Sequence, residues 1–371
     1  MTSFISPKRI LMGPGPSNVH PRVLEAMARP TIGHLDPKFI ELMDEIKELL
    51  KYAFQTKNKV TFAVSGPGSV GMETCLVNLV EPGSKVLVCI NGVFGGRMKS
   101  IVERCGAEAI VVSMPWGRAI DPQLFEEVLN KNKEITVCSF VHAETSTGVK
   151  SDIKTLTEIA HQHNCIVIAD TVTSLGGIPV LIDEWNIDVA YSGSQKCLSC
   201  PPGLSPVTFN ERAVEFIMKR KTPVQSWFMD LNLILSYWGG STKRAYHHTA
   251  PINSLYALHE ALLILKEKGM ENSWQRHKKN GDKLVSELGK IGLKPFVKES
   301  ERLPQLTSVA IPEGIDEAKV RSSLLNEYNI EIGAGLGELA GKVWRIGLMG
   351  YSSNEENINT CVSALKNILG K

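Results

Sequence analysis

Two residues that could act together in catalysis, Lys196 and Asp170, each follow a short apolar segment of the chain. Lys196 closes the run 191–196 (Tyr-Ser-Gly-Ser-Gln-Lys), and Asp170 ends the preceding apolar segment. A lysine amine forms an imine with the aldehyde of pyridoxal phosphate, while a carboxylate keeps the pyridine nitrogen protonated so that the ring accepts electrons. Either residue alone is weak evidence, because most lysines are solvated and most such aspartates cap turns. The pair predicts a site for pyridoxal 5'-phosphate.

The elements that must position this pair alternate along the chain. Apolar, β-rich runs predict strands at 60–65, 85–90, 109–113, 135–141, 165–170 and 187–192, and helical spacing predicts helices at 72–79, 95–105, 122–130 and 153–164. This alternation is typical of an α/β fold with a mostly parallel sheet. Ligands of such sheets bind at the carboxyl ends of the strands, which is where Asp170 lies.

The two ends of the chain have a different character. Asp36 followed by Pro37 predicts the start of a long helix towards residue 55. After Pro251, helices are predicted to 268 and over 272–290, and strands at 293–297, 307–311 and 343–348. We expect a large domain over 20–255 and a smaller α+β domain formed by 1–19 and 256–371. The turn-rich stretch 13–16 (Gly-Pro-Gly-Pro) is predicted to run as an arm between them.

Composition excludes several classes of protein. The 371 residues include 41 basic and 39 acidic side chains, a formal net charge of +2, which gives no field for nucleic acid or an anionic membrane surface. No apolar run reaches the ~20 residues that a bilayer requires, and the first residues lack the apolar segment of a signal peptide. We therefore expect a globular protein of the cytoplasm.

The eight cysteines predict reduced thiols rather than a disulfide framework. Several of them lie inside apolar strand or helix patterns, where a thiol behaves as a small hydrophobe. Cys197 and Cys200 form a C-x-x-C, but no second pair stands at zinc spacing nearby, and a redox role would need a thioredoxin-like context. Adjacent His247 and His248 are expected to point apart in an extended segment, so we predict no metal site there either.

The loop 66–71 (Gly-Pro-Gly-Ser-Val-Gly) fits G-x-G-x-x-G between a predicted strand and a helix. This pattern also suits a nicotinamide-binding Rossmann enzyme, but the next strand ends at Asn91-Gly92, with no acid for the ribose. Glycines and a helix N-terminus suit a single phosphate equally well. Because Pro67 cannot donate, Gly68 and Ser69 are the better candidates. A tight turn without a ligand is the third interpretation.

Several motifs in this order resemble one enzyme family over nearly the whole chain. They are 12–18 (Met-Gly-Pro-Gly-Pro-Ser-Asn), the glycine loop, 144–148 (Glu-Thr-Ser-Thr-Gly), 169–172 (Ala-Asp-Thr-Val), 192–196, 246–249 (Tyr-His-His-Thr) and 344–347 (Trp-Arg-Ile-Gly). The chain resembles the class V, fold-type I pyridoxal-phosphate aminotransferases of the alanine:glyoxylate and serine:pyruvate group. The resemblance implies a seven-stranded sheet flanked by helices.

The resemblance also implies roles for the residues at the cofactor. Lys196 would bind the aldehyde and shuttle a proton, and Asp170 would hold the pyridinium. The other implied cofactor-binding residues are Phe94, which stacks on the ring where relatives often have tryptophan, Val172 on the opposite face, Thr145 near the ring, and Gly68, Ser69 and Gln195 at the phosphate. Tyr246 and Thr249 would reach the phosphate of the neighbouring subunit, which implies a homodimer with its sites at the interface.

Arg345 is the implied residue for the substrate α-carboxylate, which it would bind bidentately. The arm residues Gly15, Ser17 and Asn18 would assist it. A structural ion pair is the alternative role for this arginine. The glycine-rich stretch 333–337 is interpreted as a place where the chain passes close to the substrate.

The implied reaction is a ping-pong transfer of an amino group from a small L-amino acid, alanine or serine, to glyoxylate or pyruvate. No second arginine has a clear claim on a side-chain carboxylate, although the loop residues Arg97 and Arg118 could enter the site. The alternatives are a ureidoglycine–glyoxylate aminotransferase, a Cβ-lyase such as a desulfurase and, more distantly, the nicotinamide-dependent oxidoreductase. The sequence does not rank alanine against serine, or glyoxylate against pyruvate.

Overall fold

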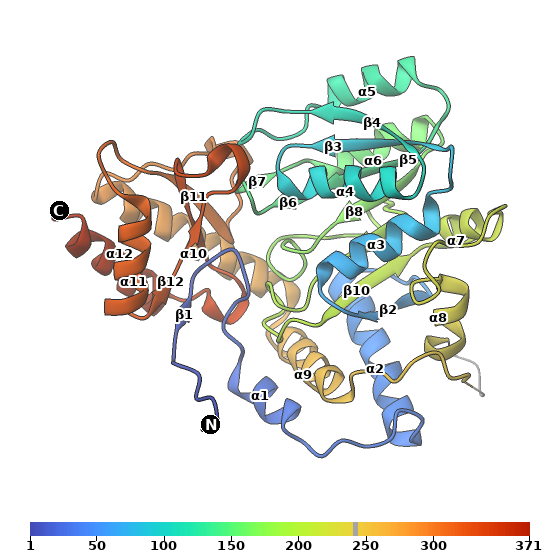
Figure 1. Cartoon of the computed structure of the whole chain (residues 1–371), viewed down its shortest axis with the longest axis horizontal. Helices are drawn as coiled ribbons and strands as arrows, with labels where there is room; N and C mark the ends of the chain where they lie inside the picture. Colours follow the sequence, from blue (N-terminus) through green and yellow to red (C-terminus); the bar gives the residue numbers. More distant parts are fainter. Residues whose placement is uncertain (240–243) are drawn as a thin grey trace.

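A seven-stranded sheet forms the centre of the computed structural model, which describes residues 1–239 and 244–371 (Figure 1). The strand order is β2-β10-β9-β8-β5-β3-β4. The strands are β2 Val60–Ser65, β3 Lys85–Ile90, β4 Glu108–Ser113, β5 Ile135–Val141, β8 Ile166–Asp170, β9 Val189–Tyr191 and β10 Leu204–Phe209. Every pairing is parallel except the two that β10 makes. The predicted α/β class and mostly parallel sheet are therefore confirmed.

The sheet is flanked by helices, as predicted (Figure 1). They are α2 Pro37–Phe54, α3 Gly68–Leu79, α4 Val93–Arg104, α5 Pro122–Lys131, α6 Ile153–Gln162, α7 Glu211–Met218, α8 Leu231–Trp238 and α9 Ile252–Lys268. Helix α2 begins as the sequence predicts, because the Asp36 side chain accepts a hydrogen bond from Lys38 N and Pro37 occupies the first turn. Helix α1, Pro21–Met27, packs against α9.

The C-terminal part surrounds a second hydrophobic core. It contains α10 Met270–Lys290, α11 Glu317–Glu327, α12 Glu355–Ile368 and an antiparallel sheet β11-β14-β13 formed by Leu306–Ala310, Val343–Gly347 and Gly333–Ala334. The N-terminal strand β1, Ile10–Leu11, pairs with β12, Ile330–Glu331, so the N-terminal arm lies against the C-terminal part (Figure 1). Helix α9 straddles the expected domain boundary at residue 255, and its buried side chains belong to the larger core.

The strand predicted at 293–297 is wrong. Only an isolated bridge between Pro295 and Val309 forms there. Phe296 N donates to Ser308 O at 2.8 Å, but Pro295 has no N–H to continue the ladder.

Strand β10 is present in the structure but was not predicted from the sequence. It carries Pro206, which argues against a strand by sequence, yet the Pro206 carbonyl still accepts a hydrogen bond from Ser192 N at 2.8 Å.

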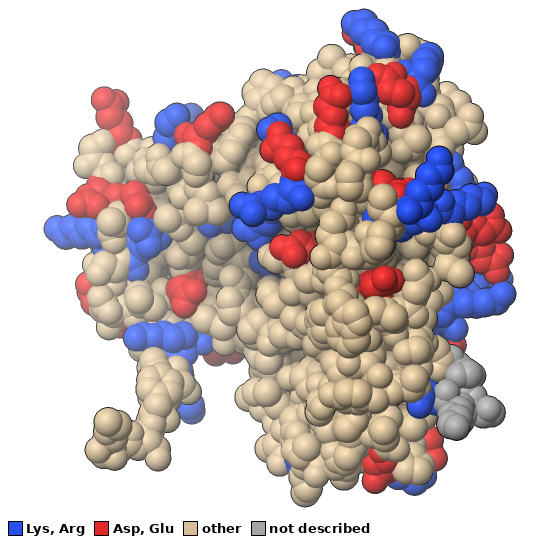
Figure 2. Space-filling model, turned by 45° about the vertical axis from the view of Figure 1, so that its right-hand side comes forward, with Lys and Arg blue, Asp and Glu red and all other residues tan. Residues whose placement is uncertain are grey.

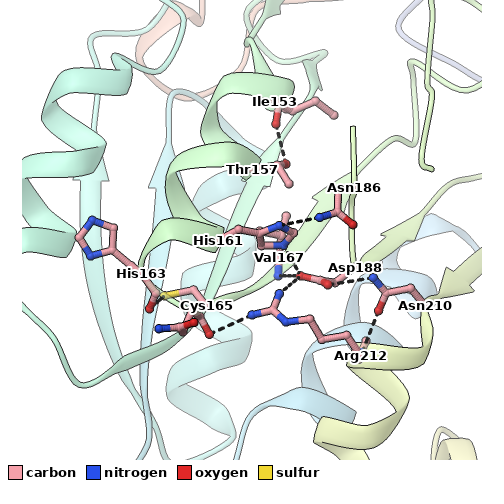
Figure 3. Close-up of polar contacts among 12 residues, drawn as sticks. Ile153, Thr157, His161, His163, Cys165, Val167, Asn186, Asp188, Asn210 and Arg212 are labelled. Carbon is pink, nitrogen blue, oxygen red and sulfur yellow. Dashed lines mark hydrogen bonds and ion pairs between the residues drawn. The ribbon is translucent and has the colours of Figure 1, made fainter. Parts of the chain in front are cut away.

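A buried carboxylate ties together the strands that lead to the candidate site (Figure 3). Asp188 is fully buried just before β9 and accepts hydrogen bonds from His161 Nε2, Val167 N and Asn210 Nδ2, each at 2.9 Å, and from Arg212 Nη1 at 2.8 Å. Burial alone would raise the pKa of Asp188, but the hydrogen bonds and the charge of Arg212 outweigh it, and the pKa is lowered. The network joins α6, β8, β9 and α7.

Three further observations concern the surface charge, the cysteines and the length of the helices. On the face in view in Figure 2, basic and acidic side chains are interspersed and form no extended patch of one sign. All eight cysteines are buried free thiols. Among the described residues, no helix combines the length and the apolar character needed to span a bilayer.

Candidate active site

One cavity of about 220 Å³ gathers most of the residues that the sequence singled out. It lies at the carboxyl ends of β5 and β8 and at the start of α3. The predicted residues that line it are Gly68, Ser69, Phe94, Thr145, Asp170, Val172, Gln195 and Lys196, and Pro67, Met72, Arg97, Val141, Ala143 and Thr173 complete the wall. The candidate lysine and the candidate carboxylate therefore face the same space.

Asp170 is the last residue of β8 and is held by two donors. Its Oδ1 accepts a hydrogen bond from Val172 N at 2.8 Å, and its Oδ2 accepts one from the Tyr191 hydroxyl at 2.7 Å. Burial raises the pKa of Asp170 to about 7, although both hydrogen bonds and the charge of Lys196 act in the opposite direction. A carboxylate in this setting favours a cationic partner, because such a partner would offset its burial.

Lys196 lies against the N-terminal arm. Its Nζ donates a hydrogen bond to the Pro14 carbonyl. Burial, followed by the charge of Arg345, lowers the pKa of Lys196 to about 8, so its amine loses its proton more readily than an ordinary lysine. Gly15 has a φ of +105°, and a Cβ there would stand 2.6 Å from Lys196 Nζ. The arm therefore requires glycine at this position.

Ser17 contacts the lysine segment from behind, and neither Ser17 nor Asn18 lies in the cavity wall. The Ser17 hydroxyl donates to the Lys196 carbonyl at 2.8 Å, and Ser17 N donates to the Gln195 carbonyl at 2.9 Å. Asn18 accepts a hydrogen bond from Leu11 N at 2.9 Å through its side chain. The contacts fix the arm against the lysine segment, while a direct role of Ser17 and Asn18 at the substrate stays a prediction.

The start of α3 forms a cradle suited to an anion. Gly68 and Ser69 open the helix after Pro67, whose side chain makes no capping bond, so the first N–H groups are available. Arg97 donates from Nη1 to the Ser69 hydroxyl at 2.9 Å and lies 5.0 Å over the Phe94 ring. Gln195 also lines the cavity, and the N–H groups of its side-chain amide are the donors that it can offer to an anion. The residues present fit a phosphate-bearing, planar cofactor.

Arg345, in β14, is buried and keeps donor capacity free. Its Nε donates to the Ala334 carbonyl at 2.7 Å, and its Nη1 donates to the Thr145 carbonyl at 3.0 Å. Within residues 1–239 and 244–371, no Asp or Glu forms an ion pair with it. Burial lowers the pKa of Arg345 to about 10, and the charge of Glu144 only partly offsets this. A ligand carboxylate would complete this guanidinium.

Tyr246 and Thr249 do not line the cavity of this chain. Both are exposed, and Tyr246 lies edge-on to His34 with ring centroids 5.3 Å apart. The expectation that His247 and His248 point apart is wrong, because their Nδ1 atoms are 2.8 Å from each other. Neither these histidines nor any other described residues form a group of three or more side chains placed to hold a metal ion.

Two residues of the site received no role from the sequence. Tyr191 reaches Asp170 because the two residues are paired between β8 and β9. Glu144 is fully buried beside Thr145 and bonds to the start of α4. The predicted strands end at Asp170 and Ser192 and would have placed Ser192 opposite Asp170, so the observed register is what assigns Tyr191. The contacts of Glu144 depend on the short hairpin of β6, Ala143–Glu144, and β7, Val149–Lys150, which no local pattern predicts.

Comparisons with a family model, with curated relatives and with solved structures all indicate an aminotransferase. The sequence model of the family Aminotransferase class-V matches residues 10–358. An alanine–glyoxylate aminotransferase of Rattus norvegicus is 43% identical over 98% of this chain and 88% of its own length. A crystal structure of alanine–glyoxylate aminotransferase from Nostoc sp. superposes with a TM-score of 0.97 at 47% identity, covering 100% of this chain and 97% of that one. An (S)-ureidoglycine–glyoxylate transaminase of Bacillus subtilis is 38% identical over 98% of this chain and 91% of its own length.

Proposed function

The chain belongs to the class-V aminotransferases, and we propose that it transfers the amino group of a small L-amino acid to glyoxylate, giving glycine and a 2-oxo acid. The observation that carries the proposal is the shared cavity of Lys196 and Asp170, next to the anion cradle at Gly68 and Ser69. The names of the rat and Nostoc relatives support glyoxylate as the acceptor.

Family membership implies pyridoxal 5'-phosphate as the cofactor. When bound, it supplies an aldehyde carbon for an amine and a ring that accepts electrons from the substrate Cα. We propose that Gly68, Ser69 and Gln195 hold its phosphate, that Asp170 faces its ring nitrogen, and that Phe94 and Val172 cover its two faces. Thr145 would bond near the ring.

The protein's own groups would then act in the following way. Asp170 would hold a proton at the ring nitrogen, and its burial makes this charge pair strong. Lys196 would take the proton from the substrate Cα and deliver it to the former aldehyde carbon of the cofactor, two bonds away. Its lowered pKa suits a group that must be neutral to accept that proton. Arg345 would orient the substrate through its α-carboxylate.

The contacts of the remaining arginines favour donors without a side-chain carboxylate. Arg97 lines the cavity, but it contacts Ser69 and Phe94 at the phosphate end. Arg118 is directed to Glu301, with 3.4 Å between Nε and Oε2. No second guanidinium among the described residues is therefore placed for aspartate or glutamate. Alanine and serine are the donors that we propose.

Sulfur transfer as in a desulfurase is the weaker alternative. Cys197 and Cys200 follow the lysine closely, but both are buried, and burial raises the pKa of the Cys197 thiol to about 12. A thiol in that state supplies almost no thiolate at neutral pH. The nearer rival is transamination of ureidoglycine, named for the Bacillus subtilis relative.

We further propose that the protein acts in the cytoplasm as a symmetric homodimer. The exposed positions of Tyr246 and Thr249 would suit contact with the cofactor phosphate of the partner subunit. A homodimer would therefore complete each site with residues that its own chain leaves at the surface.

A steady-state assay tests the proposed reaction. The holoenzyme is supplied with glyoxylate and, in separate reactions, alanine, serine, glutamate or ureidoglycine, and glycine formation is measured. Alanine or serine is expected to give a kcat/KM at least about tenfold above that of glutamate, the discrimination expected when a buried charge lacks a partner. Glutamate turnover as fast as alanine turnover would refute the small-donor proposal, and preference for ureidoglycine would favour the rival.

A further inference from the structure

Helix α4 presents two side chains to the cavity, but its own N-cap residue supplies no capping group. Phe94, in the first turn, lines the cavity, and Arg97 reaches the Ser69 hydroxyl at 2.9 Å. The residue before the helix is Gly92, and no side chain there caps it. The first N–H groups of a helix have no partner within it, so the position of this turn depends on groups from elsewhere.

Glu144 and Ser146 supply the missing acceptors. The Ser146 hydroxyl accepts a hydrogen bond from Val93 N at 2.9 Å, and Glu144 Oε2 accepts one from Phe94 N at 3.1 Å. Ser146 also donates to Glu144 Oε1, from its N at 3.0 Å and from its hydroxyl at 2.5 Å. Both side chains are fully buried. A carboxylate at the positive end of a helix, with its oxygens bonded, makes a strong cap.

The two capping side chains pack directly against the Cα of Gly92. A Cβ on Gly92 would stand 2.4 Å from the Ser146 hydroxyl oxygen and 2.5 Å from the carboxyl carbon of Glu144. Glycine at position 92 is therefore what allows the segment 144–146 to approach the helix start. The contact is part of the fold and not an incidental meeting of two flexible side chains.

The same segment also contacts Arg345, the residue proposed to bind the substrate α-carboxylate. Thr145 lies between the two capping residues and lines the cavity, and its carbonyl accepts the hydrogen bond from Arg345 Nη1 at 3.0 Å. Glu144 and Ser146 do not line the cavity themselves. One short segment thus sets the position of the aromatic face, of Thr145 and of the arginine.

We propose that Glu144, together with Ser146, is a positioning residue that fixes Phe94 and Arg97 against the bound cofactor. This inference rests on the proposed function and deepens it, because it assigns the geometry of the cofactor platform to a carboxylate outside the cavity. Glu144 acts through helix α4 and touches neither the substrate nor the reacting atoms.

Cofactor affinity is the direct readout. Pyridoxal phosphate is titrated into apoenzyme, quenching of protein fluorescence gives its Kd, and thermal unfolding is recorded for each variant. Glu144→Ala is expected to weaken binding about tenfold or more, the scale of a lost charge-assisted hydrogen bond, and Glu144→Gln less, because it keeps an acceptor. The matched control is Asp121→Ala, which removes an exposed N-cap from α5. It should lower the unfolding temperature and leave the Kd unchanged.

A double-mutant cycle separates positioning from a general loss of stability. In a Phe94→Leu background, Glu144→Gln should change the Kd less than it does in the native background, since one of the two groups through which it acts is gone. Ser146→Ala serves in place of Glu144→Ala if the latter does not fold. A Glu144→Ala or Ser146→Ala enzyme that binds the cofactor within twofold of the native Kd overturns the inference, even if it melts earlier. Failure of the native enzyme to bind pyridoxal phosphate at all would instead remove the proposed function and this inference together.

Discussion

The amine of Lys196 is buried in the folded protein, and this has a consequence for stability as well as for catalysis. Burial lowers its pKa from 10.5 to about 8, so folding disfavours the protonated form. The resulting destabilisation of the apoenzyme is fully present below the folded-state pKa and disappears above the unfolded-state pKa. Lys196→Met should therefore stabilise the apoenzyme by about 3 kcal/mol at pH 7 and by less than about 1 kcal/mol at pH 10.

Urea unfolding of both apoenzymes at the two pH values measures this difference. A gain of equal size at pH 7 and pH 10 would mean that methionine acts through packing and that the lysine charge is not the cause. The hydrogen bond to the Pro14 carbonyl is charge-assisted only while the amine is protonated, so its loss in Lys196→Met works against the predicted gain at pH 7.

Arg345 gives a second prediction at the residue scale. Lysine keeps a positive charge at this position but loses the planar fork that binds a carboxylate through two parallel bonds. Arg345→Lys should raise the KM for the amino donor roughly ten- to a hundredfold and change kcat less, because the α-carboxylate is bound alike before and during the reaction. Arg118→Lys, at an exposed ion pair, is the matched control and should leave both constants near the native values. A native KM in Arg345→Lys would contradict the assigned role.

Among the elements, strands β8 and β9 depend on the Asp188 network shown in Figure 3. Asp188→Asn removes the charge that faces Arg212 and His161, and breaking a buried pair of this kind costs about 3 kcal/mol at pH 7. Because the pKa of Asp188 is lowered on folding, its stabilisation is present above the unfolded-state pKa of 3.8 and is lost as the pH falls through the folded-state pKa.

The free-energy difference between the native protein and Asp188→Asn should therefore shrink as the pH is lowered below about 4. Chemical unfolding at pH 7 and at successively lower pH measures it. Asp152→Asn, which changes an exposed cap of α6, is the control for a charge change near the same helix. A pH-independent difference would show that Asp188 contributes through its shape alone.

The sequence predicted most of these elements because their patterns are local. Six strands of the central sheet and its carboxyl-end cavity follow from apolar runs that alternate with helices. Two errors involve proline. Pro206 lies inside β10, where its carbonyl still serves the sheet, while Pro295 limits the predicted strand at 293–297 to one bridge. Whether a proline is tolerated depends on the neighbouring strand, which a local pattern does not contain.

Local sequence patterns likewise predicted only part of the candidate site. The motifs predicted Lys196, Asp170 and the glycine loop at one site, because Asp170 ends a strand and the other two follow one. Tyr191 and Glu144 are different, since the role of Tyr191 arises from the register of two strands and that of Glu144 from a hairpin that approaches Gly92. Contacts between distant segments decide such roles, so only the three-dimensional structure assigns them.

At the scale of the whole molecule, the proposed homodimer predicts complementation between two defective enzymes. Lys196→Ala lacks the amine, and the double variant Tyr246→Phe with Thr249→Ala lacks the groups expected to reach the partner's phosphate. In a mixed dimer, one site carries all the changes and the other carries none. Mixing the two inactive or weakened proteins under conditions of subunit exchange should therefore restore activity, up to about a quarter of the native value, the statistical share of intact sites under random pairing.

Size-exclusion chromatography with light scattering establishes the oligomeric state before the mixing experiment. If Tyr246 and Thr249 served the site of their own chain, every mixed site would keep one defect and no activity would return. That result, or a monomer with full activity, would contradict the shared-site proposal.

The central claim is that this cavity carries out transamination through Lys196, and a single-turnover absorbance experiment tests it most directly. Holoenzyme is mixed with alanine or serine in the absence of an acceptor, and glyoxylate is added afterwards. We predict that the visible band of the bound cofactor is bleached by the amino acid and restored by glyoxylate, with one glycine formed per site, and that Lys196→Ala shows neither change. A native protein that binds no pyridoxal phosphate, or whose visible band does not respond to either amino acid, would contradict the account.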